Sequence, residues 1–528
     1  MTYWPNIIIG FLWLVSALVD YVDFLYLWQL KEYRTDRMRD FFSTKQGQQF
    51  WRSYPLATRA FLIIGIYVFL KDILDIHYVV IFILGIDFIY NLRAFGKGTI
   101  RRPIITKKIL LVMLIGFLIE GTLLFSTKLF PLLLLLLTFR FLLVSIIVWV
   151  FGFPTKFIKQ YYYIRRAQKK LEKTKNIIVI GITGSYGKST VKTFLAHILG
   201  NKFKTISTPK NINTEIGVAD FILANNFNDK EIFIVEMGAY HEGEIQLLCD
   251  MVKPKIGILT AINEQHLSLF GSIEKTQKAK YELLRSLPKN GLAITNIDNT
   301  YCREYISELK CKVKTFGLDE ERKPNLLITN TKSKGEELSC TAIIEGVACE
   351  ANAPIAGEHN AINIAASVLV AIHLGMNMEE IKERLKTLKP PEKTMKLHTY
   401  GQSTIIDDSY NSNPDGFKAA LNYLTGFSSE RKRIVITRGM LELGDKSDEI
   451  HKRMGEEIAF AADELVIITT DFEKSLSSGI HAKYRTTILL KDNPDDLLSY
   501  IKTQKNTNSV ILLENKMPSK VYEEIFGS

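Results

Sequence analysis

Residues 181–190, GITGSYGKST, have the composition of a phosphate-binding loop. They follow the β-rich run NIIVI and precede KSTVKTFLAHIL, which has the spacing of an amphipathic helix. Backbone N–H groups at a helix N-terminus attract anions, and Gly184 and Gly187 allow the chain to lie close to phosphates. Lys188 is expected to reach the β- and γ-phosphates, and the Ser189 hydroxyl to bind Mg²⁺. The combination favours a nucleotide site over a glycine turn with an exposed lysine.

The glycine spacing of this loop departs from the commonest pattern, G-x-x-x-x-G-K-[ST]. That pattern requires a glycine at position 182, which is Ile182, whereas the nearest glycines are Gly181 and Gly184. The loop therefore indicates a nucleotide-binding protein of a less common class.

The elements around the loop predict an α/β fold. Short strands such as IFIVEMG, IGILTAI and LAITNID alternate with helical stretches, including residues 277–287, which is typical of a mainly parallel sheet covered on both faces. Residues 325–353 predict a small antiparallel hairpin, and helices are expected at about 359–374 and 377–388. After residues 390–391, Pro-Pro, a second α/β unit is expected, with strands STIIDD, RIVIT, ELVIIT, TTILL and SVILLE.

The N-terminal part has a different texture, with several long apolar runs. A run of about 20 residues crosses a hydrocarbon core of about 30 Å. We predict five spans, at about residues 5–30, 55–72, 76–95, 109–127 and 129–151. The first span is too long, and contains too many acidic residues, for a cleavable signal peptide.

Basic residues predict the orientation of these spans. Residues 31–52 and 93–108 each hold six Lys or Arg, residues 156–175 hold eight, and the other two loops hold only Lys71 and Lys128. Positive loops stay in the cytoplasm. We therefore expect a multi-pass protein of the bacterial inner (cell) membrane, with the N-terminus outside and the rest of the chain after the last span inside. The net charge of +11 belongs largely to span ends, so nucleic acid is not an expected partner.

The ionisable residues Asp87, Glu120 and Arg140 fall inside predicted spans. Such groups are costly in a bilayer and are usually paired. Glu120 and Arg140 lie on consecutive spans and are placed to pair. The pair is either a structural ion pair that fixes helix packing or part of a proton or substrate path.

Seven ordered motifs in the second part resemble those of the Mur ligase family, and most closely its MurF branch. They are GITGSYGKST, TPKNINTEIG, VEMGAYHEGEI, TAINEQHLSLFGSIEKTQKAKYEL, GEHNAINIAAS, DDSYNSNPDG, and MLELG followed by His451. The unusual glycine spacing is that of this family. The resemblance covers about the last two-thirds of the chain and none of the apolar part.

The apolar runs and the resemblance together predict a multi-domain fold and its boundaries. An α-helical transmembrane bundle of about five helices (1–152) and a basic juxtamembrane linker (153–175) come first. A P-loop α/β ATPase domain, the Mur-ligase central domain (176–390), and a smaller Rossmann-like α/β C-terminal domain (391–528) follow.

The resemblance also implies a chemistry. Mur ligases join a carboxylate to an amine with ATP, through an acyl phosphate, so cations and N–H dipoles are expected to dominate catalysis. The implied catalytic residues are Lys188, Glu236, His266 and Lys280. The implied ATP-binding residues are Thr183, Gly184, Ser185, Gly187, Lys188, Ser189, Thr190, Asn363, Asp408 and Asn411. The implied ligands of two Mg²⁺ ions are Ser189, Glu236, His266 and Lys280.

Lys280 matches a lysine that is carbamylated in much of the family, which converts a cation into a carboxylate-like metal ligand. Without the family, it reads as a solvated helix lysine beside Lys275 and Lys278. The resemblance further places Asn211, Asn213 and Thr214 at the acyl substrate, although an Asn-rich turn with side-chain caps has the same composition.

Three departures from the MurF pattern bear on the substrates. Only about 23 residues separate the last span from the NIIVIG strand, so the N-terminal UDP-sugar-binding domain is replaced by the apolar helices. PPEKTMK stands where an arginine is expected, so Lys393 or Lys396 is a substitute. ILLENKMPSKVY replaces a K-G-S-R-like segment.

The sequence therefore predicts a membrane-anchored ATP-dependent ligase of cell-wall biosynthesis. Its expected acyl substrate is muramyl-peptide-like or lipid-linked, and its expected amine is an amino acid or dipeptide. A polyglutamate-type synthase, a transport ATPase and a non-catalytic scaffold are the alternatives.

Overall fold

The computed structural model describes most of the chain, which forms two compact units, Met1–Lys159 and Gln160–Ser528. The described residues are 4–43, 47–48, 50, 65–69, 73–96, 100–125, 127–174, 176–391, 393–410, 412–480 and 485–527.

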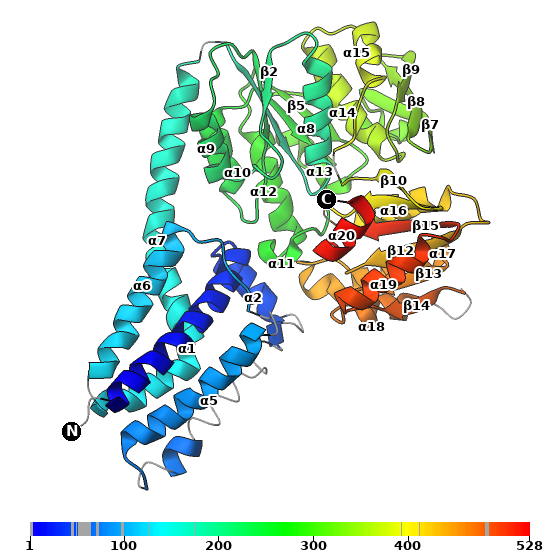
Figure 1. Cartoon of the computed structure of the whole chain (residues 1–528). Coiled ribbons are helices and arrows are strands. Elements are labelled where there is room, and N and C mark those ends of the chain that lie inside the picture. Colours follow the sequence, from blue (N-terminus) through cyan, green and yellow to red (C-terminus); the bar gives the residue numbers. More distant parts are fainter. Residues whose placement is uncertain are drawn as a thin grey trace. The chain divides into compact units, whose positions relative to one another are not determined.

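The first unit is helical, as predicted. Among its described residues, four helical segments are long and apolar enough to cross a membrane, by length and composition (Figure 1). Its helices are α1 (Trp4–Leu30), α2 (Thr35–Ser43), α5 (Ile76–Gly96), α6 (Lys107–Thr122) and α7 (Phe130–Glu172), with short 3-10 turns at Leu123–Phe125 and Thr127–Leu129. The predicted span at 55–72 lies outside the described residues except for 65–69, which are helical.

Helix α7 continues past the end of its apolar part. It departs from helical geometry at Phe139 (φ −102°, ψ 16°) and then runs to Glu172. Most of the predicted linker 153–175 is therefore the last part of this helix. Within the second unit, Ala167 and Leu171 are buried in the core, so the end of α7 packs as part of the soluble fold.

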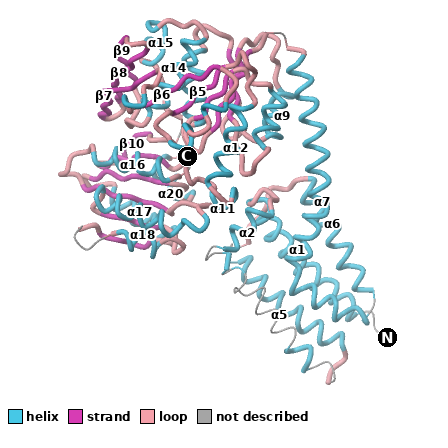
Figure 2. The backbone as a smooth tube through the Cα atoms, turned by 180° about the vertical axis from the view of Figure 1, so that it is seen from behind, coloured by secondary structure: helices cyan, strands magenta, loops and turns pink. Residues whose placement is uncertain are grey.

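The central domain is built on a sheet of nine strands in the described chain, in the order β2-β3-β1-β4-β5-β6-β7-β8-β9. The strands are β1 (Ile178–Thr183), β2 (Thr205–Ser207), β3 (Ile232–Glu236), β4 (Ile256–Leu259), β5 (Leu292–Asn296), β6 (Lys312–Gly317), β7 (Leu326–Lys334), β8 (Glu337–Ile344) and β9 (Val347–Ala353). Pairing is parallel from β2 to β7, and β7, β8 and β9 are antiparallel, which confirms the predicted hairpin at one edge of the sheet (Figure 2).

Helices cover both faces of this sheet, as the alternating pattern predicts. One face packs on α8 (Lys188–Leu199), α14 (Asn360–His373) and α15 (Met378–Leu385). The other packs on α9 (Glu215–Ala224), α10 (Glu244–Val252) and α12 (Ile273–Arg285). Two short helices, α11 (Leu267–Phe270) and α13 (Thr300–Arg303), follow β4 and β5. Strand β1, which leads into the loop, lies between β3 and β4 and is therefore an interior strand of the parallel part of the sheet.

The C-terminal domain has a second sheet, of six strands in the described residues, in the order β10-β11-β15-β12-β13-β14. The strands are β10 (Lys396–Tyr400), β11 (Ser403–Asp408), β12 (Lys432–Thr437), β13 (Glu464–Ile467), β14 (Thr487–Leu490) and β15 (Ser509–Glu514). Only the unpredicted edge strand β10 pairs antiparallel within this described sheet. Its helices are α16 (Pro414–Thr425), α17 (Ser447–Ala461), α18 (Glu473–Gly479), α19 (Pro494–Gln504) and α20 (Ser519–Phe526).

Local sequence explains where the helices near the site begin. The Ser272 hydroxyl accepts a hydrogen bond from Lys275 N (3.3 Å) and caps α12, and Asn413 caps α16, where Pro414 takes the first turn. Asn377 and Glu380 form a reciprocal capping box at α15. The caps of α12 and α16 fix where these two helices begin. Helix α12 carries Lys280, and the DDSYNSNPDG motif leads into α16.

Candidate active site

The loop between β1 and α8 has the conformation that its glycines predict. Gly184 (φ 152°) and Gly187 (φ 78°) adopt backbone angles that other residues rarely take. A Cβ at Gly184 would lie 2.0 Å from Thr260 Oγ1, and one at Gly187 would lie 2.7 Å from Asn363 Oδ1. The loop is therefore held tightly against the end of β4 and the start of α14, and both positions require glycine.

Polar contacts fix the loop to the sheet. Ser185 N donates to Ala261 O (2.7 Å), and the Ser185 hydroxyl accepts from Asn263 N (3.0 Å). The Thr183 hydroxyl donates to Met237 O (2.8 Å), which ties β1 to the end of β3. Thr190 lies buried in the first turn of α8.

Lys188 is folded back onto its own loop. Its Nζ donates to Gly184 O (2.5 Å) and Ser185 O (3.1 Å). Burial lowers the pKa of Lys188, and the negative charge of Glu236 partly opposes that shift. Because its partners are neutral carbonyl groups, this ammonium is not committed to an ion pair.

Glu236, at the carboxyl end of β3, is the centre of the polar contacts. Its Oε2 accepts from the Ser189 hydroxyl (2.9 Å) and from Lys192 Nζ (2.8 Å), and its Oε1 accepts from Asn213 Nδ2 (3.1 Å). Burial alone would raise the pKa of Glu236, but Lys192, Lys188 and these hydrogen bonds leave it lowered. Glu236 is therefore an ionised carboxylate joined to Ser189.

Lys192 was not among the residues predicted for the site. Its ammonium is buried, pairs with Glu236 and also donates to Pro209 O (3.2 Å). It lies four residues after Lys188 in α8, so both lysines fall on the same side of one helix. The four-residue spacing of Lys188 and Lys192 is the sequence signal from which Lys192 could have been predicted.

Lys280 is buried, with 2% of its surface exposed, whereas Lys275 and Lys278 are exposed. Its Nζ donates to Gly184 O (3.1 Å), the same carbonyl that accepts from Lys188. Burial, and then the charge of Lys188, lower the pKa of Lys280 well below the ordinary value. The structure thus places Lys280 against the loop and removes the reading of a solvated helix lysine.

His266 lies just after β4, in a left-handed backbone conformation (φ 61°), with the ring of Tyr240 against it. Its Nδ1 forms a hydrogen bond with Glu442 Oε2 of the C-terminal domain. Burial lowers the pKa of His266 despite the Glu442 carboxylate. The neutral imidazole is the form that can ligate a metal.

The three residues expected at the acyl substrate make different kinds of contact. Asn213 binds Glu236, and the Tyr410 hydroxyl donates to Asn211 Oδ1 across the two domains. The Thr214 side chain accepts from Gly217 N (3.4 Å) and caps α9. Thr214 therefore acts as a helix cap, as the alternative reading of this loop predicts. Asn213 instead contacts Glu236 of the site.

The remaining predicted nucleotide residues lie on two elements. Asn363 Nδ2 donates to Asn360 Oδ1 (3.1 Å) in α14, and Asn363 Oδ1 lies beside Gly187. Asp408 ends β11 and accepts from Met395 N (3.2 Å); burial raises its pKa to about 7, beside the buried carboxyl of its strand partner Glu514. Asn411 lies outside the described residues.

Oxygen atoms that could ligate the predicted Mg²⁺ ions lie beside the loop. In the described part of the chain, no three His, Cys, Asp or Glu side chains converge to hold a metal. Mg²⁺ commonly takes one or two protein carboxylates and completes its shell with phosphate oxygens and water. The Ser189 hydroxyl and the Glu236 carboxylate, joined at 2.9 Å, are oxygen donors of that type, so these residues fit a nucleotide-bound Mg²⁺.

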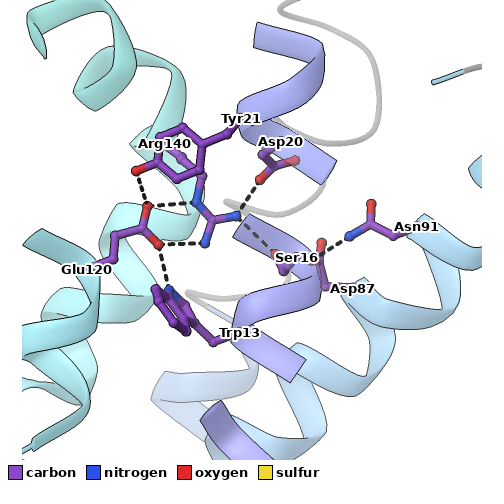
Figure 3. A network of polar contacts seen from close by, with 8 residues as sticks. All are labelled: Trp13, Ser16, Asp20, Tyr21, Asp87, Asn91, Glu120 and Arg140. Carbon is purple, nitrogen blue, oxygen red and sulfur yellow. Dashed lines mark hydrogen bonds and ion pairs between the residues drawn. The ribbon is translucent and has the colours of Figure 1, made fainter. Parts of the chain in front are cut away.

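The first unit holds a second buried set of charges (Figure 3). Arg140 donates to Glu120 Oε1 (2.9 Å) and Oε2 (2.8 Å), which confirms the predicted pair. It also binds Asp20 (2.6 Å) and Ser16 (3.0 Å) of α1. Tyr21 and Trp13 donate to Glu120 at 3.0 and 2.7 Å.

This cluster accounts for a helix contact as well. A Cβ at Gly116 would lie 2.2 Å from the Tyr21 hydroxyl, so glycine allows α1 and α6 to approach. On α5, Asn91 Nδ2 donates to Asp87 Oδ2 (3.1 Å), one turn away. The contacts of Arg140 join α1, α6 and α7 and support the structural reading of the pair.

Together, the glycine-shaped loop on an interior parallel strand, the Ser189–Glu236 pair and the second, mainly parallel sheet define a P-loop nucleotide-binding protein with a Rossmann-like partner domain. The family models agree with this class and narrow it. The Mur ligase middle domain matches residues 182–371, and the Mur ligase, glutamate ligase domain matches residues 395–514. The chain belongs to the Mur ligase family.

Curated relatives give the branch that this chain is similar to. UDP-N-acetylmuramoyl-tripeptide–D-alanyl-D-alanine ligase of Buchnera aphidicola subsp. Baizongia pistaciae is 31% identical over 334 residues, which cover 61% of this chain and 70% of that protein. The enzyme of the same name from Bacillus subtilis (strain 168) is 31% identical over 282 residues, covering 53% of this chain and 60% of that one. The chain thus spans about 60% of the length of the latter relative.

Solved structures share the fold. MurF from Thermotoga maritima in complex with ADP has a TM-score of 0.62 at 24% identity, over 69% of this chain and 83% of that one. MurF from Acinetobacter baumannii has a TM-score of 0.62 at 24% identity, over 70% of this chain and 80% of that one.

Proposed function

We propose that this chain is a membrane-anchored ATP-dependent acid–amino-acid or peptide ligase, similar to MurF, that forms an amide bond in cell-wall biosynthesis. One observation carries the proposal. In a chain of the Mur ligase family, Lys188 and Lys280 both bind the Gly184 carbonyl of the loop, and Lys188 directly precedes Ser189 of the Ser189–Glu236 pair. Three ionisable groups, Lys188, Lys280 and Glu236, thus lie around the loop at which we place the phosphates of ATP.

In this proposal, Lys188 exchanges its two carbonyl partners for phosphate oxygens when ATP binds. The loop N–H groups and the α8 N-terminus add further positive potential. The substrate carboxylate attacks the γ-phosphorus, ADP leaves, and an acyl phosphate remains. The amine then attacks the acyl carbon and loses a proton, and phosphate leaves.

Ser189 and Glu236 are the residues that would hold one Mg²⁺, and His266 with carbamylated Lys280 the second. When bound, Mg²⁺ ions neutralise charge on the transferred phosphoryl group and orient the reacting oxygens. The lowered pKa of Lys280 supports carbamylation, because the neutral amine is the form that reacts with carbon dioxide. Asn213 holds the other oxygen of Glu236 and thereby links the substrate loop to this carboxylate.

We further propose that the acyl substrate is muramyl-peptide-like and reaches the site in lipid-linked form. Apolar helices precede the ligase domains here, and α7 extends past the end of the last span to Glu172. We place the helices in the bacterial inner membrane with the N-terminus outside and the ligase domains in the cytoplasm, because basic residues cluster in alternate loops. The amine is an amino acid or dipeptide.

Product analysis tests these proposals. Purified full-length protein in detergent is incubated with ATP, Mg²⁺, soluble or lipid-linked muramyl peptides, and a panel of amino acids and dipeptides, and products are identified by mass spectrometry. A new amide with stoichiometric ADP is expected. Equal turnover of UDP-linked and lipid-linked peptides would exclude the lipid-linked preference, and repeated addition of glutamate alone would identify a polyglutamate-type synthase.

A further inference from the structure

The contact between His266 and Glu442 joins the two domains at the site. His266 follows β4 of the central domain, and Glu442 lies in the loop after β12 of the C-terminal domain. Besides the Nδ1–Oε2 hydrogen bond, the backbone N–H of Ser268 donates to Glu442 O (3.0 Å). Side chain and main chain of Glu442 therefore both hold the segment that carries the histidine.

The backbone at this contact is held in uncommon conformations on both sides. His266 (φ 61°) and Glu442 (φ 64°) are non-glycine residues in the left-handed region. A Cβ at Gly444, two residues after Glu442, would lie 3.3 Å from Ser268 Cα, so the two loops approach closely. Such strain persists only where surrounding contacts determine the conformation, and it is concentrated at functional sites.

The hydrogen bond also determines which ring nitrogen is available. A neutral histidine that donates from Nδ1 to a carboxylate presents the lone pair of Nε2. Among the described residues, no hydrogen bond to His266 Nε2 is present. Metal-ligating histidines commonly donate their other N–H to a carboxylate, which fixes the ring and raises its basicity.

We infer that Glu442 is a positioning residue that holds His266 with Nε2 free to ligate a divalent cation, and that the C-terminal domain thereby completes a metal site of the central domain. The inference rests on the proposed function. It adds to that function a dependence of metal binding on the position of the C-terminal domain. The imidazole is oriented only when Glu442 is in place.

Binding of Mn²⁺, as a paramagnetic substitute for Mg²⁺, tests the inference with full-length protein in detergent and a non-hydrolysable ATP analogue. Glu442→Ala is expected to weaken one of two Mn²⁺ sites by about 10- to 100-fold, the range for lost outer-shell partners. It should also remove the imidazole nitrogen signal from the electron spin-echo envelope modulation of bound Mn²⁺. Asp445→Asn, which removes an exposed carboxylate from the same loop, is the matched control and should change neither readout.

Two further variants keep the test decisive. On a His266→Ala background, Glu442→Ala should cause no additional loss of Mn²⁺ affinity, since both act through one ligand. If Glu442→Ala fails to fold, Glu442→Gln keeps the shape and should weaken one site at least threefold. Wild-type affinity and nitrogen modulation in the Glu442 variants would overturn the inference alone. A wild-type chain that binds nucleotide and Mn²⁺ at no site would instead overturn the proposed function.

Discussion

Arg140 in the N-terminal apolar helices, and Lys192 and Lys280 beside the phosphate loop, are buried, and Lys188 of the loop is half-buried, but the partners of these cations differ. Arg140 is fully buried and binds two carboxylates and a hydroxyl from other helices. Lys188 and Lys280 instead bind backbone carbonyls of the loop. A cation with two carboxylates is already neutralised, whereas one on neutral carbonyls gains energy when an anion arrives.

Lys192 lies between these two cases. It pairs with Glu236, as Arg140 pairs with Glu120, yet Glu236 also binds Ser189 and Asn213 of the site. The comparison teaches that burial of charge does not by itself indicate function. What distinguishes the sites is whether the partner group can be exchanged for a ligand, and the variants below test that distinction.

The largest expected effect is on the stability of the N-terminal apolar helices. Arg140→Leu leaves Asp20 and Glu120 buried without their cation, so we expect a loss of about 3–5 kcal/mol. Thermal unfolding of the purified protein in detergent measures it. The triple variant Arg140→Leu with Asp20→Leu and Glu120→Leu should recover most of the stability, because no charge is then left unpaired. If the triple variant is as unstable as the single one, the structural reading of the cluster is wrong.

The second effect is on turnover. Lys188→Ala removes the cation expected at the transferred phosphoryl group, and we expect product formation to fall by about 100- to 1,000-fold, the usual cost of one electrostatic contact in a transition state. Stability should change little, since the carbonyl partners remain within the loop. Initial rates of ADP release measure it, with the exposed Lys275→Ala as control. Undiminished turnover would contradict the assignment of the loop.

A third variant concerns the ion pair between Lys192 and Glu236. Lys192→Met removes one partner of Glu236, and we expect the ligand-free protein to lose about 1–3 kcal/mol. Because Mg²⁺ no longer competes with an ammonium for Glu236 Oε2, the increase in melting temperature on adding Mg²⁺ with ADP should be larger than in the wild type. An equal or smaller increase would show that Lys192 supports the bound state too and does not compete with the metal.

The remaining expected effect is a pH dependence of the C-terminal domain. Burial raises the pKa of Asp408 to about 7, so the folded state retains a proton that the unfolded chain releases near its ordinary value of 3.8. Stability from this group is therefore fully present below about pH 4 and is lost as pH rises to about 7. Melting temperatures between pH 4 and 8 should decline less in Asp408→Asn, and an unchanged slope would contradict this assignment.

Much of the fold could be predicted because its signals are local. The strands of both sheets that the sequence analysis quotes are present, and the two helices after the hairpin begin within a residue of expectation. Strands β2, β6 and β10 were missed. The first has three residues, the second begins with polar alternation, and the third is an edge strand whose pairing depends on β11 rather than on its own composition.

The site, like the fold, has one part that local sequence predicts and another that depends on packing. The loop glycines, Lys188 and Ser189 are contiguous, so their shared role follows from one stretch of sequence. Glu236 could be placed at a strand end, but its pairing with Lys192 depends on how α8 packs against β3. The roles predicted for these residues, and for Asn211, Thr214 and Asn363, remain predictions.

The sequence by itself determined most of the elements and the glycine spacing of the loop, and it placed Glu120 and Arg140 on adjacent predicted spans, within reach of a pair. Only the tertiary structure decided that Asp20 and Ser16 share Arg140, that Lys280 reaches the same carbonyl as Lys188, and that Glu442 holds His266. Hydrophobic period and glycine spacing act over a few residues. These contacts join positions from 96 to 176 residues apart, and packing of whole domains brings them together.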